Sequence, residues 1–434
     1  MEEDRGFGFD DFSMEMEEFE YKQVKKFDRI FKISEGGTIF QYPCIYDGKV
    51  IVGCMDKNLY ALDARTGTLL WKFKAEGGYV PSSPVAWEGI IYIGSYDQNL
   101  YAVDASKGSL VWKFHTYEKV CSRPTICNGR VYFGSNDYNL YCLDAKTGSL
   151  VWKFKTMGEI PSQPTIYKNM VFFGSFDHFL YCLDADTGSL KWKHETQGEI
   201  FNEDELLIAN DVVYFPSFDN LLRALDIRTQ KILWKLKTGS FGGMHSGPRM
   251  HNNILYQANR EGILRAITLE GKELWNFRLN NAMAIPLVHD DRIYFGTEDQ
   301  ALYCLDLKGN VMWKFYTQGS LWWKPAVWDG NIYFSSHDCN LYCVEIETHR
   351  LVWKFRGQGS PSVWPSPFES YELTVKKAFR ESGLKEGESR KTYNIETEKF
   401  DEGGRFYKSR ITYQVSTQYR EKGKYQKDSD EEEF

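Results

Sequence analysis

The sequence of 434 residues lacks a long apolar run, and no stretch approaches the roughly 18 apolar residues of a membrane-spanning helix. It also lacks a basic excess: its net charge is −7, whereas a nucleic-acid surface requires clustered lysine and arginine. Its first residues, MEEDRGFGFDDFSMEMEEFE, lack the basic start and apolar stretch of a secretory signal. We therefore expect a cytoplasmic protein with no membrane span and no nucleic-acid partner.

Paired cysteines are missing as well. The nine cysteines include no Cys-Cys or Cys-x-x-Cys pair, and an odd number in a reducing compartment argues against a disulfide framework. Four of them occupy one repeat position that is alanine in other copies, namely Cys142, Cys182, Cys304 and Cys343. Exchange between cysteine and alanine is typical of a small core residue, so this pattern favours a core role over metal binding or redox chemistry.

A helical period is absent from residues 36–356, and a tryptophan repeat is present instead. The repeated residues stand 38 to 42 positions apart and are Trp71, Trp112, Trp152, Trp192, Trp234, Trp275, Trp313 and Trp353. The second copy divides into four short strands at 85–87, 90–95, 100–104 and 109–114, separated by Gly, Asp or Asn. Eight such antiparallel units predict an all-β, eight-bladed β-propeller whose blades are stabilised by their neighbours.

A turn motif precedes the tryptophan in the clearest copies. Residues 61–71 read ALDARTGTLLW, and residues 142–152 and 182–192 follow the same pattern. Asp63 can accept backbone N–H bonds in the turn, and Gly67 tolerates a positive φ. Trp71 can pack between adjacent blades, where its N–H finds an acceptor. The eight tryptophans are therefore predicted to be structural.

This motif resembles the tryptophan-docking signature of the PQQ-like propeller repeat, and the resemblance covers about residues 36–356. The chain is similar to the small non-enzymatic members of that superfamily, typified by the BamB scaffold. The resemblance implies a non-catalytic scaffold that binds a protein or peptide, with no cofactor. The alternative is a quinoprotein-like protein that binds PQQ or another small molecule, with Ca²⁺, and acts as an oxidoreductase. The dehydrogenases of the superfamily carry a vicinal Cys-Cys pair, which this sequence lacks.

Composition divides the chain into four segments. Residues 1–25 are acidic and predicted to be disordered, residues 26–368 form the propeller, residues 369–427 form an extension, and residues 428–434 form an acidic tail. Within the extension, strands at 391–400 and 407–419 and a turn at 402–404 predict a β-hairpin, which is either an appendage or a partner-binding element. Segments 29–33 and 363–368 resemble extra blade strands, and one of them is expected to lock a monomeric ring.

The segment that leads into the first strand of each blade is expected to line one mouth of the central channel. These segments read PSSP, CSRP and PSQP in blades 2 to 4, and the other blades depart from that pattern. The candidate partner-binding residues are Gln41, Arg123, Gln163, Asn202, Glu203, Asp204, Glu205, His245, Trp322, Trp323 and Lys324. The carboxylates could meet a basic group, and the indole rings could stack on a peptide; alternatively, the rim is polar because it is wet.

No catalytic or metal-binding residue is predicted. A G-x-S-x-G nucleophile motif is absent, and the histidines are scattered over the blades without the i, i+4 spacing of a helical metal site. Residues of different blades can still converge on the axis of a propeller, so a metal site there stays open. The sequence favours a protein that is not an enzyme.

Overall fold

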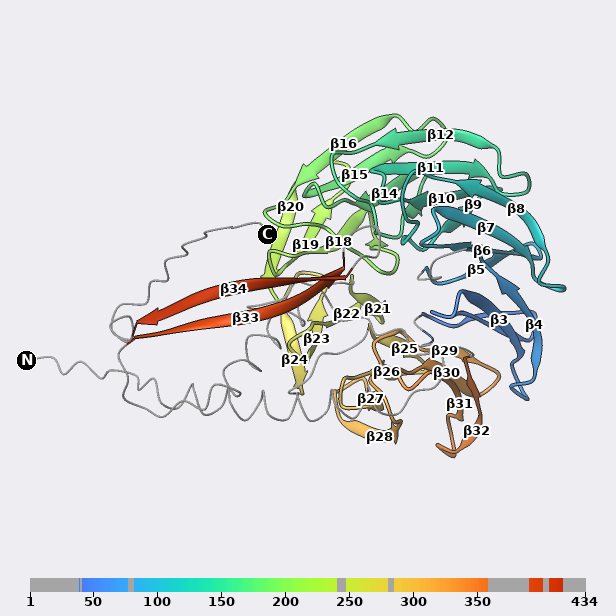
Figure 1. Cartoon of the computed structure of the whole chain (residues 1–434). Helices are drawn as coiled ribbons and strands as arrows, with labels where there is room; N and C mark the ends of the chain where they lie inside the picture. The colour runs from blue at the N-terminus through green and yellow to red at the C-terminus, as the bar shows by residue number, and fades with distance from the viewer. Residues whose placement is uncertain are drawn as a thin grey trace, which may run out of the picture. The chain divides into compact units, whose positions relative to one another are not determined.

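The computed structural model describes residues 39, 41–76, 82–239, 247–279 and 285–357, together with the strands at 390–400 and 406–416. The chain forms two units, Met1–Ser362 and Val363–Phe434. The first unit contains eight four-stranded antiparallel sheets arranged in a ring (Figure 1). The described residues contain no helix, and hence none that could cross a membrane. The predicted all-β, eight-bladed propeller is therefore confirmed.

Each blade consists of four strands that are consecutive in the chain. The strands of blades 1 to 4 are β1 (Cys44–Tyr46), β2 (Lys49–Gly53), β3 (Asn58–Asp63), β4 (Leu69–Lys74), β5 (Val85–Trp87), β6 (Ile90–Gly94), β7 (Asn99–Asp104), β8 (Leu110–His115), β9 (Thr125–Cys127), β10 (Arg130–Gly134), β11 (Asn139–Asp144), β12 (Leu150–Lys155), β13 (Thr165–Tyr167), β14 (Met170–Gly174), β15 (Phe179–Asp184) and β16 (Leu190–Glu195). Those of blades 5 to 8 are β17 (Leu207–Ala209), β18 (Val212–Ser217), β19 (Leu221–Asp226), β20 (Ile232–Lys237), β21 (Arg249–His251), β22 (Ile254–Ala258), β23 (Ile263–Thr268), β24 (Glu273–Arg278), β25 (Leu287–His289), β26 (Arg292–Gly296), β27 (Ala301–Asp306), β28 (Val311–Tyr316), β29 (Ala326–Trp328), β30 (Asn331–Ser335), β31 (Asn340–Glu345) and β32 (Leu351–Arg356).

The tryptophans lie on the fourth strand of each blade, and most pack against the turn motif of the next blade. Six indole N–H groups donate to a backbone carbonyl of that blade at 2.7 to 3.1 Å, those of Trp71, Trp112, Trp152, Trp234, Trp275 and Trp353. The ring of Trp152 lies so close to Gly188 that an added Cβ would stand 2.6 Å from it. Trp313 differs, because its ring stacks on His349 with centroids 4.7 Å apart.

The ring closes by side-chain contacts between blade 8 and blade 1. Trp353 Nε1 and the Tyr333 hydroxyl both donate to the carbonyl of Ala64, at 3.0 and 3.1 Å. Ser335 Oγ donates to the carbonyl of Gln41 at 2.7 Å. Segments 29–33 and 363–368, one of which was expected to lock the ring, both lie outside the described residues.

The hydrophobic core lies between the blades. One cluster joins Cys142 on blade 3 to Phe173 on blade 4, and equivalent clusters join the other neighbouring blades. The four cysteines at the alanine position are fully buried, as expected for small core residues. All nine cysteines are free thiols, and burial raises the pKa of Cys142 to about 12. Such thiols stay protonated at neutral pH.

The second unit contains a two-stranded antiparallel sheet. Its strands are β33 (Arg390–Phe400) and β34 (Phe406–Ser416), and Phe400 stands opposite Phe406. The predicted pairing of these two strands is confirmed, although the second strand ends at Ser416. The predicted turn at 402–404 and the two acidic segments at 1–25 and 428–434 lie outside the described residues.

Candidate functional site

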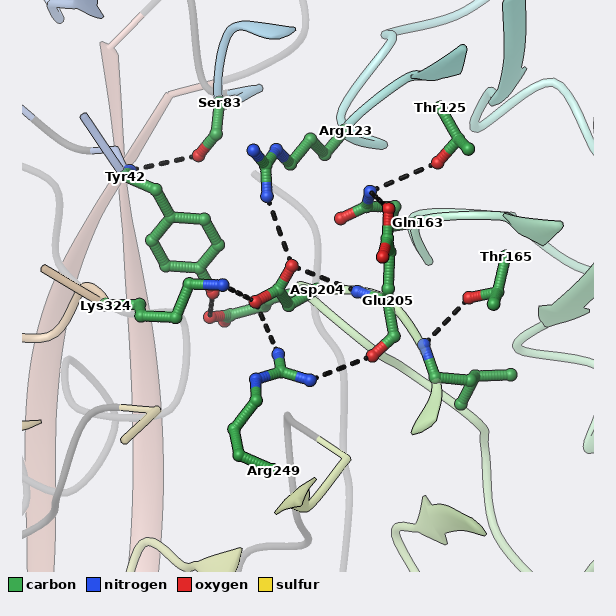
Figure 2. A network of polar contacts seen from close by, with 12 residues as sticks. Tyr42, Ser83, Arg123, Thr125, Gln163, Thr165, Asp204, Glu205, Arg249 and Lys324 are labelled. Atoms are coloured by element: carbon green, nitrogen blue, oxygen red, sulfur yellow. Dashed lines mark hydrogen bonds and ion pairs between the residues drawn. The ribbon is translucent and has the colours of Figure 1, made fainter. Parts of the chain in front are cut away.

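Side chains from five blades meet in one polar network, which we call the axial cluster. Its members are Tyr42, Arg123, Glu203, Asp204, Arg249 and Lys324. They belong to blades 1, 3, 5, 6 and 8, and residues of such separated blades can touch one another only at the centre of the ring. Figure 2 shows the cationic side chains converging on Asp204 from different sides. All but Arg249 come from the segments that lead into the first strands.

The carboxylate of Asp204 is the centre of this cluster. Its side chain is 4% exposed and contacts Arg123 Nη1 at 3.1 Å. Its second oxygen binds Arg249 Nη2 and Lys324 Nζ. Burial opposes ionisation of Asp204, but the attraction of Arg249, Lys324 and Arg123 outweighs it and holds the pKa far below its usual range. Asp204 is therefore negatively charged at every pH at which proteins are commonly studied.

The three cations outnumber the carboxylate that they share. Burial, together with repulsion from Arg249 and Arg123, lowers the pKa of Lys324 to about 8 although Asp204 opposes the shift. The Nε atoms of Arg123 and Arg249 are buried and have no partner among the described residues. Buried donors in native proteins are normally satisfied by protein, water or ligand. The three cations therefore carry more charge than Asp204 neutralises, and two of their N–H donors have no partner among the described residues.

Glu203 adds a titratable group beside the cations. The Tyr42 hydroxyl donates to Glu203 Oε2 at 3.2 Å. Burial raises the pKa of Glu203 to about 7, against the opposing effect of Arg260. The ring of Tyr42 also lies 5.7 Å from the Arg123 guanidinium carbon and 5.6 Å from Lys324 Nζ. Tyr42 therefore connects a carboxyl group that is half protonated near neutrality to two of the cations.

Glu205 is exposed and is oriented by its neighbours. Gln163 Nε2 donates to Glu205 Oε1 at 3.3 Å and to Thr125 Oγ1 at 3.1 Å. Arg249 Nη1 donates to the backbone carbonyl of Glu205 at 3.1 Å. These bonds, drawn in Figure 2, attach the acidic stretch of blade 5 (residues 203–205) to blades 3, 4 and 6.

Two predicted site residues belong to the interior instead. Gln41 is fully buried, and its Oε1 accepts a hydrogen bond of 2.7 Å from the backbone N–H of Gly53 in blade 1. Asn202 is also fully buried, and its backbone N–H donates to Ser162 Oγ at 3.2 Å. Both residues therefore lie inside the propeller, and the side-chain amide of Asn202 has no hydrogen-bond partner among the described residues. His245 lies outside the described residues.

The two predicted tryptophans are half-buried and have aromatic neighbours. Trp322 lies against His337, with ring centroids 4.4 Å apart. Trp323 meets Tyr42 edge to face at 5.6 Å, which places it beside the axial cluster. Burial lowers the pKa of His337 to about 4, so this imidazole is neutral at pH 7. The Trp323 indole therefore gives the cluster an apolar border.

The prediction from sequence did not select Tyr42 or Arg249. Tyr42 stands inside the unusual lead-in segment of blade 1, where Gln41 was selected instead. Arg249 is the first residue of β21, and the other seven first strands begin with Cys44, Val85, Thr125, Thr165, Leu207, Leu287 and Ala326. A charged residue at a position that is otherwise small or apolar was a signal that could have identified it.

The acidic stretch also differs from its expected role. The sequence indicated that Glu203, Asp204 and Glu205 could receive a basic group of a ligand. In the structure the protein's own cations already neutralise Asp204. No group of three or more His, Cys, Asp or Glu side chains that could hold a metal ion occurs within the described part of the chain.

The sequence profile of the family described as outer membrane protein assembly factor BamB matches residues 55–166, 155–245 and 218–322. These matches cover more than half of the chain. The chain belongs to this family. A comparison with curated proteins found no match.

Solved structures share the fold of this BamB-family chain. BamB from Moraxella catarrhalis is 18% identical, with a TM-score of 0.60, over 69% of this chain and 91% of that chain. The computationally designed Ika8 protein is 17% identical, with a TM-score of 0.62, over 71% and 97%. The quinohemoprotein alcohol dehydrogenase ADHIIG from Pseudomonas putida HK5 is 15% identical, with a TM-score of 0.59, over 71% and 70%. Likeness at these identities shows the fold alone.

Proposed function

We propose that this BamB-family propeller is a non-catalytic, cytoplasmic and monomeric scaffold that binds a protein or peptide partner at the axial cluster. The observation that carries the proposal is the surplus of cations around Asp204, bordered by the half-buried indole ring of Trp323. Aromatic and arginine side chains that lie together are typical of binding hot spots. Tyr42, Trp323 and Lys324 stand where the lead-in segments depart from the repeat, and Arg249 begins a first strand at a position that is small or apolar in the other blades, so the ring geometry alone does not require them.

The excess of positive charge in the axial cluster favours an acidic group on the partner. Three cations share one carboxylate, and the Nε–H groups of Arg123 and Arg249 are buried without a partner among the described residues. Guanidinium groups bind carboxylates through paired, charge-assisted hydrogen bonds. An aspartate, a glutamate or a C-terminal carboxylate next to an apolar residue would match both the cations and the border formed by Trp323.

The test is affinity capture from native lysate followed by mass spectrometry. We expect the double variant Trp322→Ala/Trp323→Ala and the single variant Arg249→Gln to lose the same captured protein. Because the contact is charge-assisted, the protein captured by the natural chain should elute as the salt concentration rises. The matched control is Trp328→Ala, which removes an indole of the same blade that contacts Arg65 away from the axis. A partner list that is the same for all variants would refute the proposal.

The alternative function is a quinoprotein-like protein with PQQ and Ca²⁺, and it rests on the fold shared with a quinohemoprotein dehydrogenase. The axial residues do not fit this pair of ligands. Calcium requires several oxygen ligands, but the buried carboxylate of Asp204 is surrounded by three cations that would repel Ca²⁺. The visible spectrum of the purified protein checks this conclusion, because bound quinone absorbs. A quinone band, or a thermal shift with Ca²⁺, would favour the alternative.

A further inference from the structure

Two groups of aromatic side chains lie near the axial cluster, one on blades 4 and 5 and the other on blade 8. In the blade-5 aromatic group, Phe176 meets Phe201 edge to face with ring centroids 6.1 Å apart, and it lies 6.4 Å from Phe218. In the blade-8 aromatic group, Trp322 lies 4.4 Å from His337. All five rings are half-buried, so each keeps part of its surface exposed.

The two groups occupy the same positions of the repeat. Phe201 and Trp322 each follow the buried aliphatic residue of a lead-in segment. The backbone N–H groups of Phe176, Phe218 and His337 donate to the carbonyl of the residue before such an aliphatic residue, at 2.9 to 3.0 Å. Equivalent positions of a propeller are related by rotation about its axis. Both groups therefore lie at the same mouth of the channel.

The fold does not require aromatic residues at these positions. At the position of Phe201 and Trp322, the other described segments carry Cys121 and Pro161. At the position of Phe218 and His337, the blades outside the two groups carry Met55, Tyr96, Asn136, Arg260 and Glu298. Among the described residues, both positions of one blade are aromatic only in blades 5 and 8. Aromatic residues that the frame does not need indicate a role in binding.

The lead-in segment of blade 5 is also longer than its equivalent in blade 4. The chain advances seven positions from Ile200 to Leu207, the first residue of β17, but only five from Ile160 to Thr165, the first residue of β13. The additional length falls in the stretch that carries Asp204 to the three cations at the axis. This segment is therefore built for a contact that the regular repeat does not make.

Short stretches of chain connect both aromatic groups to the contact between Asp204 and Lys324, which Figure 2 shows. Phe201 stands three positions before Asp204, and Trp322 stands two positions before Lys324. Because a chain advances at most about 3.6 Å per residue, the Cα atoms of these two pairs are within about 11 and 7 Å of each other. The mouth thus has cations at its centre, with one aromatic group on the blade-5 side and another on the blade-8 side.

Carboxylates border the blade-5 aromatic group. Burial raises the pKa of Glu159, and Lys119 opposes this shift. Glu118 and Glu199 are close enough to raise it further, so three carboxylates and one lysine stand together. The residue of blade 8 that is equivalent to Glu199 is Ser320. A basic residue of a ligand therefore complements the blade-5 end of the mouth and not the blade-8 end.

We infer that the mouth binds an extended partner segment in which one acidic residue is flanked by apolar residues, with a basic residue beyond the apolar residue at the blade-5 end. This inference rests on the function proposed above and adds the sequence pattern of the partner. The acidic residue meets Arg123 and Arg249, and the apolar residues meet the two aromatic groups. The stretches that connect these groups to the axis place the apolar residues within about four positions of the acidic one.

The test is a selection of random nine-residue peptides, displayed on phage, against the purified full chain. We expect the enriched peptides to share one aspartate or glutamate, an aliphatic or aromatic residue within four positions on each side, and a lysine or arginine toward one end. The most enriched peptide is then synthesised with a fluorescent label, and its Kd is measured by anisotropy. Arg249→Gln should weaken its binding at least about tenfold, because the acidic residue loses a guanidinium partner.

Variants of the aromatic groups test the two flanks separately. The double variant Phe176→Asn/Phe218→Asn inserts the residue type that blade 3 carries at this position, and Trp322→Ala removes the indole of the blade-8 group. Each should weaken binding about tenfold. The matched control is Tyr96→Asn, which changes the same repeat position in blade 2 and should alter the Kd less than about twofold. Cooperative urea unfolding of each variant verifies that the ring is folded.

Three results would overturn the inference. The first is a selection that enriches no sequence, or one that enriches peptides without an acidic residue. The second is a peptide whose binding is weakened by Arg249→Gln but by neither aromatic variant, which would leave the proposed function in place. The third is a peptide whose binding is unchanged by Arg249→Gln, which would contradict the proposed function as well.

Discussion

Replacement of Asp204 by asparagine tests whether the axial cluster is held together by one carboxylate. Asparagine keeps the shape of the side chain but removes the charge that Arg123, Arg249 and Lys324 share. Breaking a buried ion pair costs about 3–5 kcal/mol, because the remaining charge is left uncompensated. The three cationic side chains are 19 to 21% exposed, so water partly screens them. We therefore expect a loss of about 3 kcal/mol in the free energy of unfolding.

Urea denaturation at pH 7.5 measures this loss, with Asp329→Asn as the control. Asp329 pairs with Arg65, but their side chains are 49% and 71% exposed, so its replacement should cost less than about 1 kcal/mol. A double-mutant cycle adds a second test. Lys324→Met should stabilise the Asp204→Asn protein, because it removes one of the repelling cations, whereas it should not stabilise the natural chain. Equal losses of stability for Asp204→Asn and Asp329→Asn would refute the role of Asp204. So would a Lys324→Met substitution that changes the stability of the natural chain and of the Asp204→Asn protein by the same amount.

Two further predictions concern the pH dependence of stability and the packing between blades. The pKa of Glu203 is raised from 4.5 to about 7 in the folded chain, so its protonated form contributes stability at pH 5 that is lost as the pH rises through 7. Glu203→Gln should therefore gain about 2–3 kcal/mol relative to the natural chain between pH 5 and pH 8, as measured by urea denaturation at both pH values. Gly188→Ala should cost about 3 kcal/mol, because its Cβ would stand 2.6 Å from the Trp152 ring at a φ of +69°. Gly89→Ala, with a φ of +81° and nothing within 4 Å, should cost only about 1–2 kcal/mol in thermal or urea unfolding.

The architecture was predictable because each repeat carries its own strand and core signals, and the repeat occurs eight times. The tryptophan interval determines the number of blades, and the strands of the second copy were placed to within one residue of β5 to β8. The exchange between cysteine and alanine identified core positions such as Cys142. Each of these signals lies within one repeat of about forty residues, so no knowledge of distant contacts was necessary.

The chemistry of the axial cluster was less predictable, because it depends on contacts between distant parts of the chain. The lead-in segments that break the repeat were identified, and most of the cluster lies on them. The partners of Asp204 stand 81, 45 and 120 positions away in the chain, and the sequence does not show which blades face one another across the axis. The three carboxylates in succession were therefore interpreted as an acidic site, whereas the structure places Asp204 in a cationic one.

Departure from the repeat is what makes an asymmetric centre possible. Eight identical blades would place eight identical side chains around the axis, and a ring of like charges would repel itself. Blades 2 to 4 stay regular and are joined by a serine ladder, in which Ser82 donates to the carbonyl of Ser122, Ser122 to that of Ser162, and Ser162 to that of Ile200, at 2.8 to 3.2 Å.

The ladder ends at Ile200, three positions before the acidic stretch of blade 5 begins at Glu203. In the lead-in segments of blades 2 to 4, hydroxyl groups satisfy the backbone of the next blade, so these segments are held to a similar geometry. Asn202 still bonds to Ser162 and Gln163 of blade 4, but the residues that follow it depart from the repeat, and Asp204 reaches across the axis to Arg123, Arg249 and Lys324. The regular blades thus hold the ring in a fixed geometry, and blade 5 supplies Asp204. Eight identical blades could not place one such carboxylate at the centre.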